Sequence, residues 1–199
     1  MILRRGESVR IVEPSRVLKA KVCLIGEAAV GKTSLIRRYV EDAFDDRYIT
    51  TLGAKVSLKR VWISSKNDPS SQLEVQMSIW DLIGERAYLE TLHQSYMRGT
   101  MGLIAVCDVT RYSTFEALDR WITETFRISG EVPLALVVNK VDLKDQVPEL
   151  LYEPTEPQRK AQTYGGFAIW TSAKSGENVN SLFTKLALGM VRRLASEPA

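Results

Sequence analysis

Histidine and cysteine are scarce in this chain of 199 residues, which contains one His and two Cys. Cys23 and Cys107 both lie in apolar runs that resemble strands. Thiols in such runs usually fill a core rather than form a disulfide, and free thiols suggest a reducing compartment. We therefore expect two free cysteines. The single histidine, His93, is expected to be a partly exposed packing residue on a helix.

Signals for membranes and nucleic acid are also lacking. There is no signal peptide, no internal repeat and no apolar run long enough to span a bilayer. Ile2 follows Met1, so a myristoylation signal is missing, and residues 196–199 contain no cysteine for prenylation. The 27 Lys and Arg residues only slightly exceed the 24 Asp and Glu residues, which does not indicate nucleic-acid binding. We expect a cytoplasmic protein with no covalent membrane anchor and no nucleic-acid partner.

The composition is that of one globular domain. Hydrophobic residues make up 45% of the chain and charged residues 26%, which are ordinary proportions. The length is sufficient for a complete α/β core but short for two domains. We place one domain over residues 17–194, an N-terminal extension over 1–16 and a short tail over 195–199. For the extension, an additional strand, a disordered segment and a basic membrane-touching segment all stay open.

A phosphate-binding loop is the most informative motif. Residues 26–33 read G-E-A-A-V-G-K-T and lie between an apolar run and a helical pattern. In such a loop, backbone N–H groups curl around a phosphate and the helix N-terminus favours its charge. Gly26 and Gly31 would permit close approach, Lys32 would reach the terminal phosphates, and Thr33 would bind Mg²⁺. The alternative is a tight turn with no ligand.

The rest of the chain alternates between strand and helix patterns. Period-2 alternation at 54–61 and 73–79, around a polar turn cluster, predicts an antiparallel hairpin at a sheet edge. Uninterrupted apolar runs at 102–107, 134–138 and 167–170 are typical of parallel strands covered on both faces. Together with a strand at 17–25, these predict an α/β fold: a mostly parallel six-stranded sheet with one antiparallel edge hairpin and helices on both faces.

Helices are expected at 32–40, 88–96, 113–128, 156–164 and 178–194. Ser113 and Glu116 have the spacing of a capping box, with Ser113 as the N-cap. The proline-containing stretch at 145–157 is expected to be a surface loop.

Polar clusters follow three further strands at the point where each strand ends. Asp81 ends the second hairpin strand, Asn139-Lys140-Val141-Asp142 follows the run at 134–138, and Thr171-Ser172-Ala173-Lys174 follows the run at 167–170. Ligands of open α/β sheets bind outside the carboxyl ends of the strands. We therefore expect these clusters and the loop at 26–33 to meet at one rim.

The order of these motifs resembles that of the small GTPases of the Ras superfamily, and the Rab branch is the most similar. The resemblance covers residues 17–194 and rests on G-x-x-x-x-G-K-T, D-x-x-G at 81–84, N-K-x-D at 139–142 and S-A-K at 172–174. Trp80-Asp81, Tyr96-Met97-Arg98-Gly99 and Asp108-Val109-Thr110 strengthen it. The resemblance implies the P-loop NTPase (small G-protein) fold, with GTP or GDP and Mg²⁺ as cofactors.

The resemblance also implies how the base is recognised. Asp142 would accept hydrogen bonds from the ring N–H and the exocyclic amine of guanine, a donor pair that adenine lacks. Asn139 would join the base-binding segment to the phosphate loop, and the stem of Lys140 would cover one face of the base. The Ala173 N–H would mark the guanine carbonyl, and Phe44 would lean on the base. The implied nucleotide contacts are Gly26, Glu27, Ala28, Ala29, Val30, Gly31, Lys32, Thr33, Ser34, Phe44, Tyr48, Thr51, Gly84, Asn139, Lys140, Asp142, Ser172, Ala173 and Lys174.

Two segments carry the implied switch. Thr51 aligns with the threonine that reaches Mg²⁺ and the γ-phosphate in the GTP state, with Thr50 as the alternative. The implied metal residues are Thr33, Thr51 and Asp81, and the implied catalytic residues are Glu85, Lys32, Thr51 and Gly84. Loss of the γ-phosphate would relax switch I (about 42–53) and switch II (about 82–97). Effectors, exchange factors and GTPase-activating proteins would bind through these segments.

Glu85 departs from the family pattern, which places glutamine directly after the D-x-x-G glycine. A carboxylate can accept a hydrogen bond from the attacking water but cannot donate one to the transition state, and it brings negative charge towards a triphosphate. Because the phosphate, metal and base sets are complete, we expect a GTPase with slow intrinsic hydrolysis. One alternative is a GTP-binding scaffold with negligible hydrolysis. Another is a structural protein that bound nucleotide stabilises.

Overall fold

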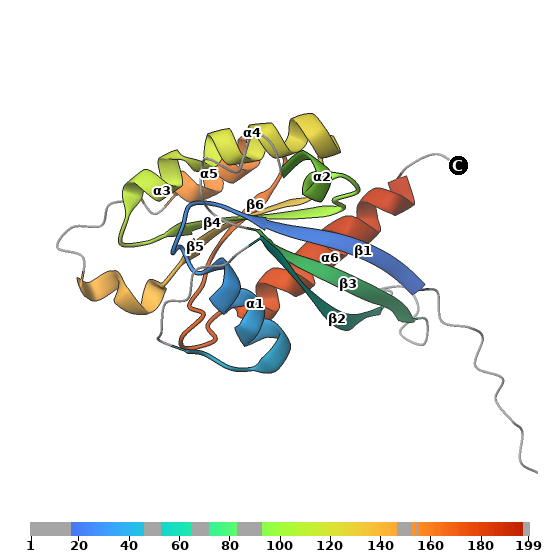
Figure 1. The fold of residues 1–199 in the computed structure, drawn as a ribbon, viewed down its shortest axis with the longest axis horizontal. Coiled ribbons are helices and arrows are strands. Elements are labelled where there is room, and N and C mark those ends of the chain that lie inside the picture. The colour runs from blue at the N-terminus through green and yellow to red at the C-terminus, as the bar shows by residue number, and fades with distance from the viewer. Residues whose placement is uncertain are drawn as a thin grey trace, which may run out of the picture.

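The computed structural model describes residues 17–45, 53–64, 72–82, 93–146, 153 and 155–196. Within these residues, six strands form one sheet in the order β2-β3-β1-β4-β5-β6 (Figure 1). The strands are β1 Val17–Ile25, β2 Ala54–Ser64, β3 Gln72–Leu82, β4 Gly102–Asp108, β5 Leu134–Asn139 and β6 Phe167–Trp170. Only β2, at the edge, runs antiparallel to its neighbour; β1 with β3 and β4, β4 with β5, and β5 with β6 are parallel pairs. The predicted fold class is therefore confirmed.

Burial on both faces explains the uninterrupted apolar runs. Every residue of β4 and β5 is buried. Successive side chains of a strand point to opposite faces, so Leu103, Ala105 and Cys107 join one apolar cluster while Ile104 and Val106 join the other. Asp108 and Asn139 are the polar residues that end these two strands. Because β4 and β5 are parallel and the two residues pair in register, they lie side by side at the carboxyl end of the sheet.

Helices cover both faces of the sheet (Figure 1). On one face lie α1 Lys32–Glu41 and α6 Val179–Ser196, where the rings of Tyr39 and Phe183 stack with centroids 3.8 Å apart. On the other face lie α2 His93–Met97, α3 Tyr112–Glu116, α4 Leu118–Ser129 and α5 Glu156–Thr163. A short 3₁₀ helix, η2 Val141–Gln146, follows β5. Within the described residues, no helix is long and apolar enough to cross a membrane.

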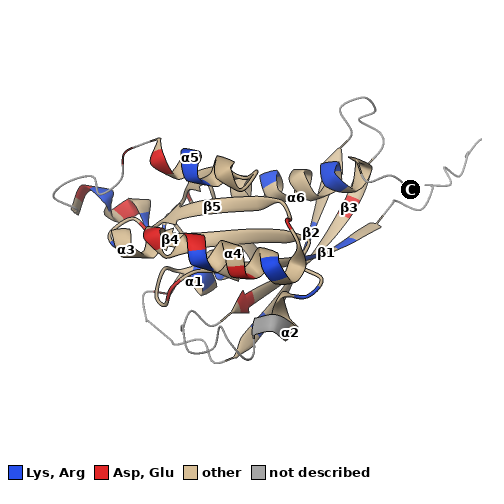
Figure 2. Cartoon of the chain, turned by 90° about the horizontal axis from the view of Figure 1, so that it is seen from above, with Lys and Arg blue, Asp and Glu red and all other residues tan. Residues whose placement is uncertain are grey.

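Acidic and basic residues are interspersed on α4 and α5 (Figure 2). This mixture matches the small net charge of the chain. Both cysteines are buried thiols that are not joined in a disulfide, as predicted. His93 begins α2, and its side chain lies outside the described part of the chain.

The predicted capping box is wrong. The region predicted as one helix forms α3 and α4, which meet at Ala117, and α3 begins after Arg111 rather than after Ser113. The reason is a tight turn at the end of β4, in which the N–H of Arg111 bonds the carbonyl of Asp108 at 3.0 Å. The side-chain hydroxyl of Thr114 accepts a hydrogen bond of 2.9 Å from the Asp108 N–H, and among the described residues no side-chain hydrogen bond caps the start of α3.

Candidate functional site

The loop between β1 and α1, residues 26–31, curves into a concave backbone that we call the cradle. Gly26 has φ 132° and Gly31 has φ 97°, and Ala29 between them is also left-handed at φ 61°. A Cβ on Gly26 would lie 2.2 Å from the carbonyl oxygen of Val106, and a Cβ on Gly31 would lie 2.4 Å from the side-chain nitrogen of Asn139. Glycine is therefore required at both positions by conformation and by space.

Lys32 lies at the N-terminus of α1 and folds back across this loop. Its ammonium group donates hydrogen bonds of 2.8 Å to the Gly26 carbonyl and 2.9 Å to the Glu27 carbonyl. The side chain is buried, and burial lowers the pKa of Lys32 to about 8, against the opposing effect of Asp81 and Glu27. An anion in the cradle would favour the charged form of this amine.

Thr33 and Asp81 form a compact oxygen pair beside Lys32. The Thr33 hydroxyl donates a hydrogen bond of 2.5 Å to the carboxylate of Asp81, which is buried near the end of β3. A hydroxyl and a carboxylate are hard oxygen donors, the kind that Mg²⁺ prefers. This donor set fits the magnesium site that the sequence predicts.

Asn139 joins the loop at 26–31 to the segment after β6. Its side-chain N–H donates to the Val30 carbonyl at 2.9 Å. Its side-chain oxygen accepts from the Thr171 hydroxyl at 3.1 Å and from the Ala173 N–H at 3.3 Å. Asn139 is 1% exposed, so all three bonds are made in a dry environment. Asn139 therefore connects the loop between β1 and α1 to the segment after β6.

Asp142 stands in η2 with its side chain exposed and held in place. The hydroxyl of buried Ser172 donates a hydrogen bond of 2.5 Å to one Asp142 oxygen. The same hydroxyl accepts the Ser175 N–H at 3.0 Å. A carboxylate oriented in this way can accept hydrogen bonds from a ligand at the rim.

Asp108 and Arg111 are part of the same rim, and the sequence analysis assigned them no role. Lys140, at φ 66°, donates to Asp108 at 2.6 Å, and Arg111 donates to the same carboxylate at 3.1 Å. A second Arg111 nitrogen donates to the Ala28 carbonyl at 2.9 Å, which ties α3 to the cradle. Burial would raise the pKa of Asp108, but hydrogen bonds from Lys140 and Thr110 outweigh it and hold the pKa below its ordinary value. The sequence did contain a signal for Asp108, because this residue ends a parallel strand and ligands bind outside such strand ends.

The remaining predicted residues are placed unevenly. Glu27 accepts a hydrogen bond of 3.3 Å from the ring N–H of Trp121, which connects the cradle to α4. Phe44 is half-buried and packs against the apolar cluster beneath α1 and α6. Ala28, Ala29 and Val30 lie in the cradle, Ser34 in the first turn of α1, and exposed Lys174 after Ala173. Tyr48, Thr50, Thr51, Gly84 and Glu85 lie outside the described residues.

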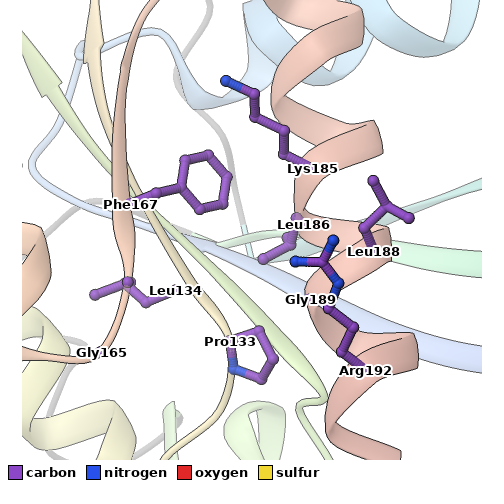
Figure 3. Close-up of a pocket in the computed structure, with 10 residues that line it drawn as sticks. Pro133, Leu134, Gly165, Phe167, Lys185, Leu186, Leu188, Gly189 and Arg192 are labelled. Atoms are coloured by element: carbon purple, nitrogen blue, oxygen red, sulfur yellow. The ribbon is translucent and has the colours of Figure 1, made fainter. Parts of the chain in front are cut away.

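A separate cavity of about 310 Å³ lies between α6 and the starts of β5 and β6 (Figure 3). Phe167 and Leu134 contribute from the strands, and Lys185 and Arg192 from α6. The cavity lies at the amino ends of the parallel strands, whereas the cradle follows the carboxyl end of β1. It is not part of the rim.

Comparisons with known proteins agree with this geometry. The model of the Ras family matches residues 21–192. The Ras-related protein Rab-21 of Geodia cydonium is 38% identical over 171 residues, covering 85% of this chain and 70% of the relative. The Ras-related protein SEC4 of Saccharomyces cerevisiae is 36% identical over 168 residues, covering 84% and 73%. The Ras-related protein Rab-1D of Dictyostelium discoideum is 34% identical over 176 residues, covering 88% and 81%.

Proposed function

The chain belongs to the Ras family of small GTPases and is Rab-like, and we propose that it is a molecular switch that binds GTP and GDP with Mg²⁺ and hydrolyses GTP to GDP and phosphate. One observation carries the proposal: Asn139 bonds both the cradle, through Val30, and the segment after β6, through Thr171. In this proposal the cradle binds the phosphates and the segment after β6 binds the base, so Asn139 would hold the two at the fixed separation that a nucleotide requires.

The cradle supports binding of the phosphates. Its backbone leaves no room for a Cβ at Gly26 or Gly31, and α1 begins directly after it, so the helix N-terminus favours negative charge. Lys32 would exchange its carbonyl partners for phosphate oxygens and would be held in the charged form. Thr33 and Asp81 would hold Mg²⁺, which supplies charge neutralisation at the terminal phosphates when bound.

The opposite end of the rim supports selection of guanine. Asp142 offers a carboxylate that Ser172 orients, and guanine presents a ring N–H and an amine that together match it. Adenine presents no such pair, so binding it would leave the carboxylate without its partners. Ala173 and Lys140 complete the base-binding group in this proposal.

Hydrolysis in this proposal is slow without a partner protein. Glu85 stands where the family has a glutamine that orients the attacking water. The negative charge of Glu85 disfavours approach to the γ-phosphate, whereas its oxygens can still accept a hydrogen bond from water. The competing proposal is a scaffold that binds GTP without turnover.

Exchange of GDP for GTP would rearrange switch I (42–53) and switch II (82–97), and partner proteins would recognise the GTP form. Effectors, an exchange factor and a GTPase-activating protein are the partner classes in this proposal. Two buried cysteine thiols outside any disulfide favour a reducing compartment such as the cytoplasm.

Single-turnover hydrolysis of Mg²⁺-GTP tests the proposal. We expect slow turnover by the wild-type protein, none by Lys32→Ala, and unchanged turnover by the control Lys19→Ala, because Lys19 is an exposed residue of β1. Faster turnover by Glu85→Gln would show that the carboxylate slows the reaction. If the wild type binds GTP and leaves it intact while Glu85→Gln hydrolyses it, the scaffold proposal replaces the switch proposal. If the protein binds neither GTP nor GDP, both proposals fail.

A further inference from the structure

We propose that Arg38 is a positioning residue for guanine binding, because it holds the backbone of residues 173 and 174 against α1 from outside the nucleotide site. This inference rests on the proposed function, since it concerns the affinity of the base-binding segment. Arg38 itself would not touch the nucleotide.

Arg38 bonds two residues that are far from it in the sequence. From the last turn of α1, its Nε donates to the Ala173 carbonyl at 2.9 Å, and one terminal nitrogen donates to the Lys174 carbonyl at 2.7 Å. The side chain is only 19% exposed. Two rigid N–H groups of one guanidinium therefore bind two successive carbonyls, a geometry that arginine provides and lysine does not.

The other terminal nitrogen of Arg38 reaches the end of α1. It donates to the carbonyl and to the carboxylate of Asp42, each at 3.2 Å. Asp42 caps α1 in the left-handed region, at φ 51°, and its N–H bonds the Arg38 carbonyl at 3.1 Å. One side chain thus connects the base-binding segment to the residue from which switch I continues.

Arg38 and Asn139 hold Ala173 from two sides. The Ala173 carbonyl is bonded by Arg38, and the Ala173 N–H is bonded by the Asn139 oxygen at 3.3 Å. The N–H bond is long, so this group can also be shared with a ligand oxygen. Without Arg38, the carbonyls of Ala173 and Lys174 would lose their hydrogen bonds to α1, and the segment would be held less firmly.

The test compares GDP release from wild type, Arg38→Ala, Arg38→Lys and Arg37→Ala in the presence of Mg²⁺. Arg37 is a matched control, since it is the preceding residue of α1 and its guanidinium pairs with Glu41 and Asp45, each at 3.4 Å. We expect release about tenfold faster from Arg38→Ala, because two bonds from a charged donor are lost. The rate of GDP release from Arg38→Lys should lie between the rates of Arg38→Ala and wild type. Arg37→Ala should stay within about twofold of wild type.

A second measurement separates positioning from a general loss of stability. The affinity for GDP is compared with that for 2-aminopurine riboside diphosphate, which keeps the exocyclic amine but lacks the guanine carbonyl oxygen and the ring N–H beside it. The analogue therefore binds more weakly to every variant, and only the ratio of variant to wild type is compared. Arg38→Ala should weaken GDP binding about tenfold and analogue binding by no more than about twofold. Equal losses for both ligands, or GDP release that matches Arg37→Ala, would overturn the inference. If Arg38→Ala does not fold, Arg38→Lys supplies the same comparison. A wild-type protein that does not bind GDP would instead refute the proposed function.

Discussion

The side-chain amide of Asn139 donates a hydrogen bond of 2.9 Å to the carbonyl oxygen of Val30, although the two residues are 109 positions apart. Asn139→Ala would leave the buried Val30 carbonyl and the Thr171 hydroxyl without this partner. We expect the variant to lose about 3 kcal/mol of unfolding free energy and to bind GDP more weakly. Urea unfolding measures the first effect and equilibrium binding the second.

The matched control is Asn180→Ala, an exposed position on α6, which should change stability by less than about 0.5 kcal/mol. Equal stability of the two variants would show that the Asn139 contacts do not hold the site together.

Gly26→Ala should destroy the cradle. The new Cβ would lie 2.2 Å from the Val106 carbonyl oxygen, a backbone atom that cannot move aside cheaply. Gly99→Ala is the control, because Gly99 also has positive φ, at 72°, but has open space around it. We expect Gly99→Ala to cost about 1 kcal/mol of unfolding free energy from backbone strain alone, and Gly26→Ala to cost more and to abolish GDP binding. Retained GDP binding by Gly26→Ala would contradict the account of the cradle.

Lys32 should make the nucleotide-free protein more stable at higher pH. Its pKa is lowered to about 8 in the folded protein from 10.5, so between these values the unfolded chain binds more protons than the folded one. Unfolding free energy therefore rises with pH across this window, and the contribution is lost as pH falls through about 8. Relative to Lys32→Met, the wild type should gain about 2 kcal/mol between pH 8 and 9.5.

Urea unfolding of both proteins at these two pH values tests this expectation. If the unfolding free energy of wild type relative to Lys32→Met stays constant or falls as pH rises, Lys32 is not desolvated in the folded protein.

Thr33→Val should uncouple GDP release from Mg²⁺. The substitution keeps the shape of the side chain but removes the hydroxyl that bonds Asp81 at 2.5 Å. We expect GDP release in Mg²⁺ to be about tenfold faster than from wild type, with little further change when EDTA is added. Thr163→Val, whose hydroxyl bonds only the exposed end of α5 through Lys160, should respond to EDTA as the wild type does. A strong EDTA response in Thr33→Val would place the metal elsewhere.

The sheet could be predicted because burial of its central strands on both faces leaves a clear pattern in the sequence. Residues 102–107 are apolar without alternation because both faces of β4 are buried, and that pattern can be recognised from neighbouring residues alone. The rim could be predicted from topology, since parallel strands bring their ends together. Asn139, Asp142 and Ala173 lie where this rule places them. Tyr48, Thr51, Gly84 and Glu85 stay predictions, as they fall outside the described residues.

The contacts that sequence reasoning missed are long-range. Arg38 and Arg111 look like ordinary surface arginines in the sequence, and their partners are 135 and 83 residues away. No spacing or periodicity encodes such pairs. The N-cap at Ser113 was wrong for a related reason: the local pattern was present, but the turn from Asp108 to Arg111 fixed an earlier start for the helix.

Equilibrium binding of GDP and ADP to wild type and Asp142→Ala tests whether this rim selects guanine nucleotides. We expect wild type to prefer GDP over ADP by at least about 10³-fold. Asp142→Ala should lose most of this preference while its fold is unchanged, because Asp142 is exposed. Equal affinity of the wild type for GDP and ADP, or a preference that survives in Asp142→Ala, would contradict this expectation.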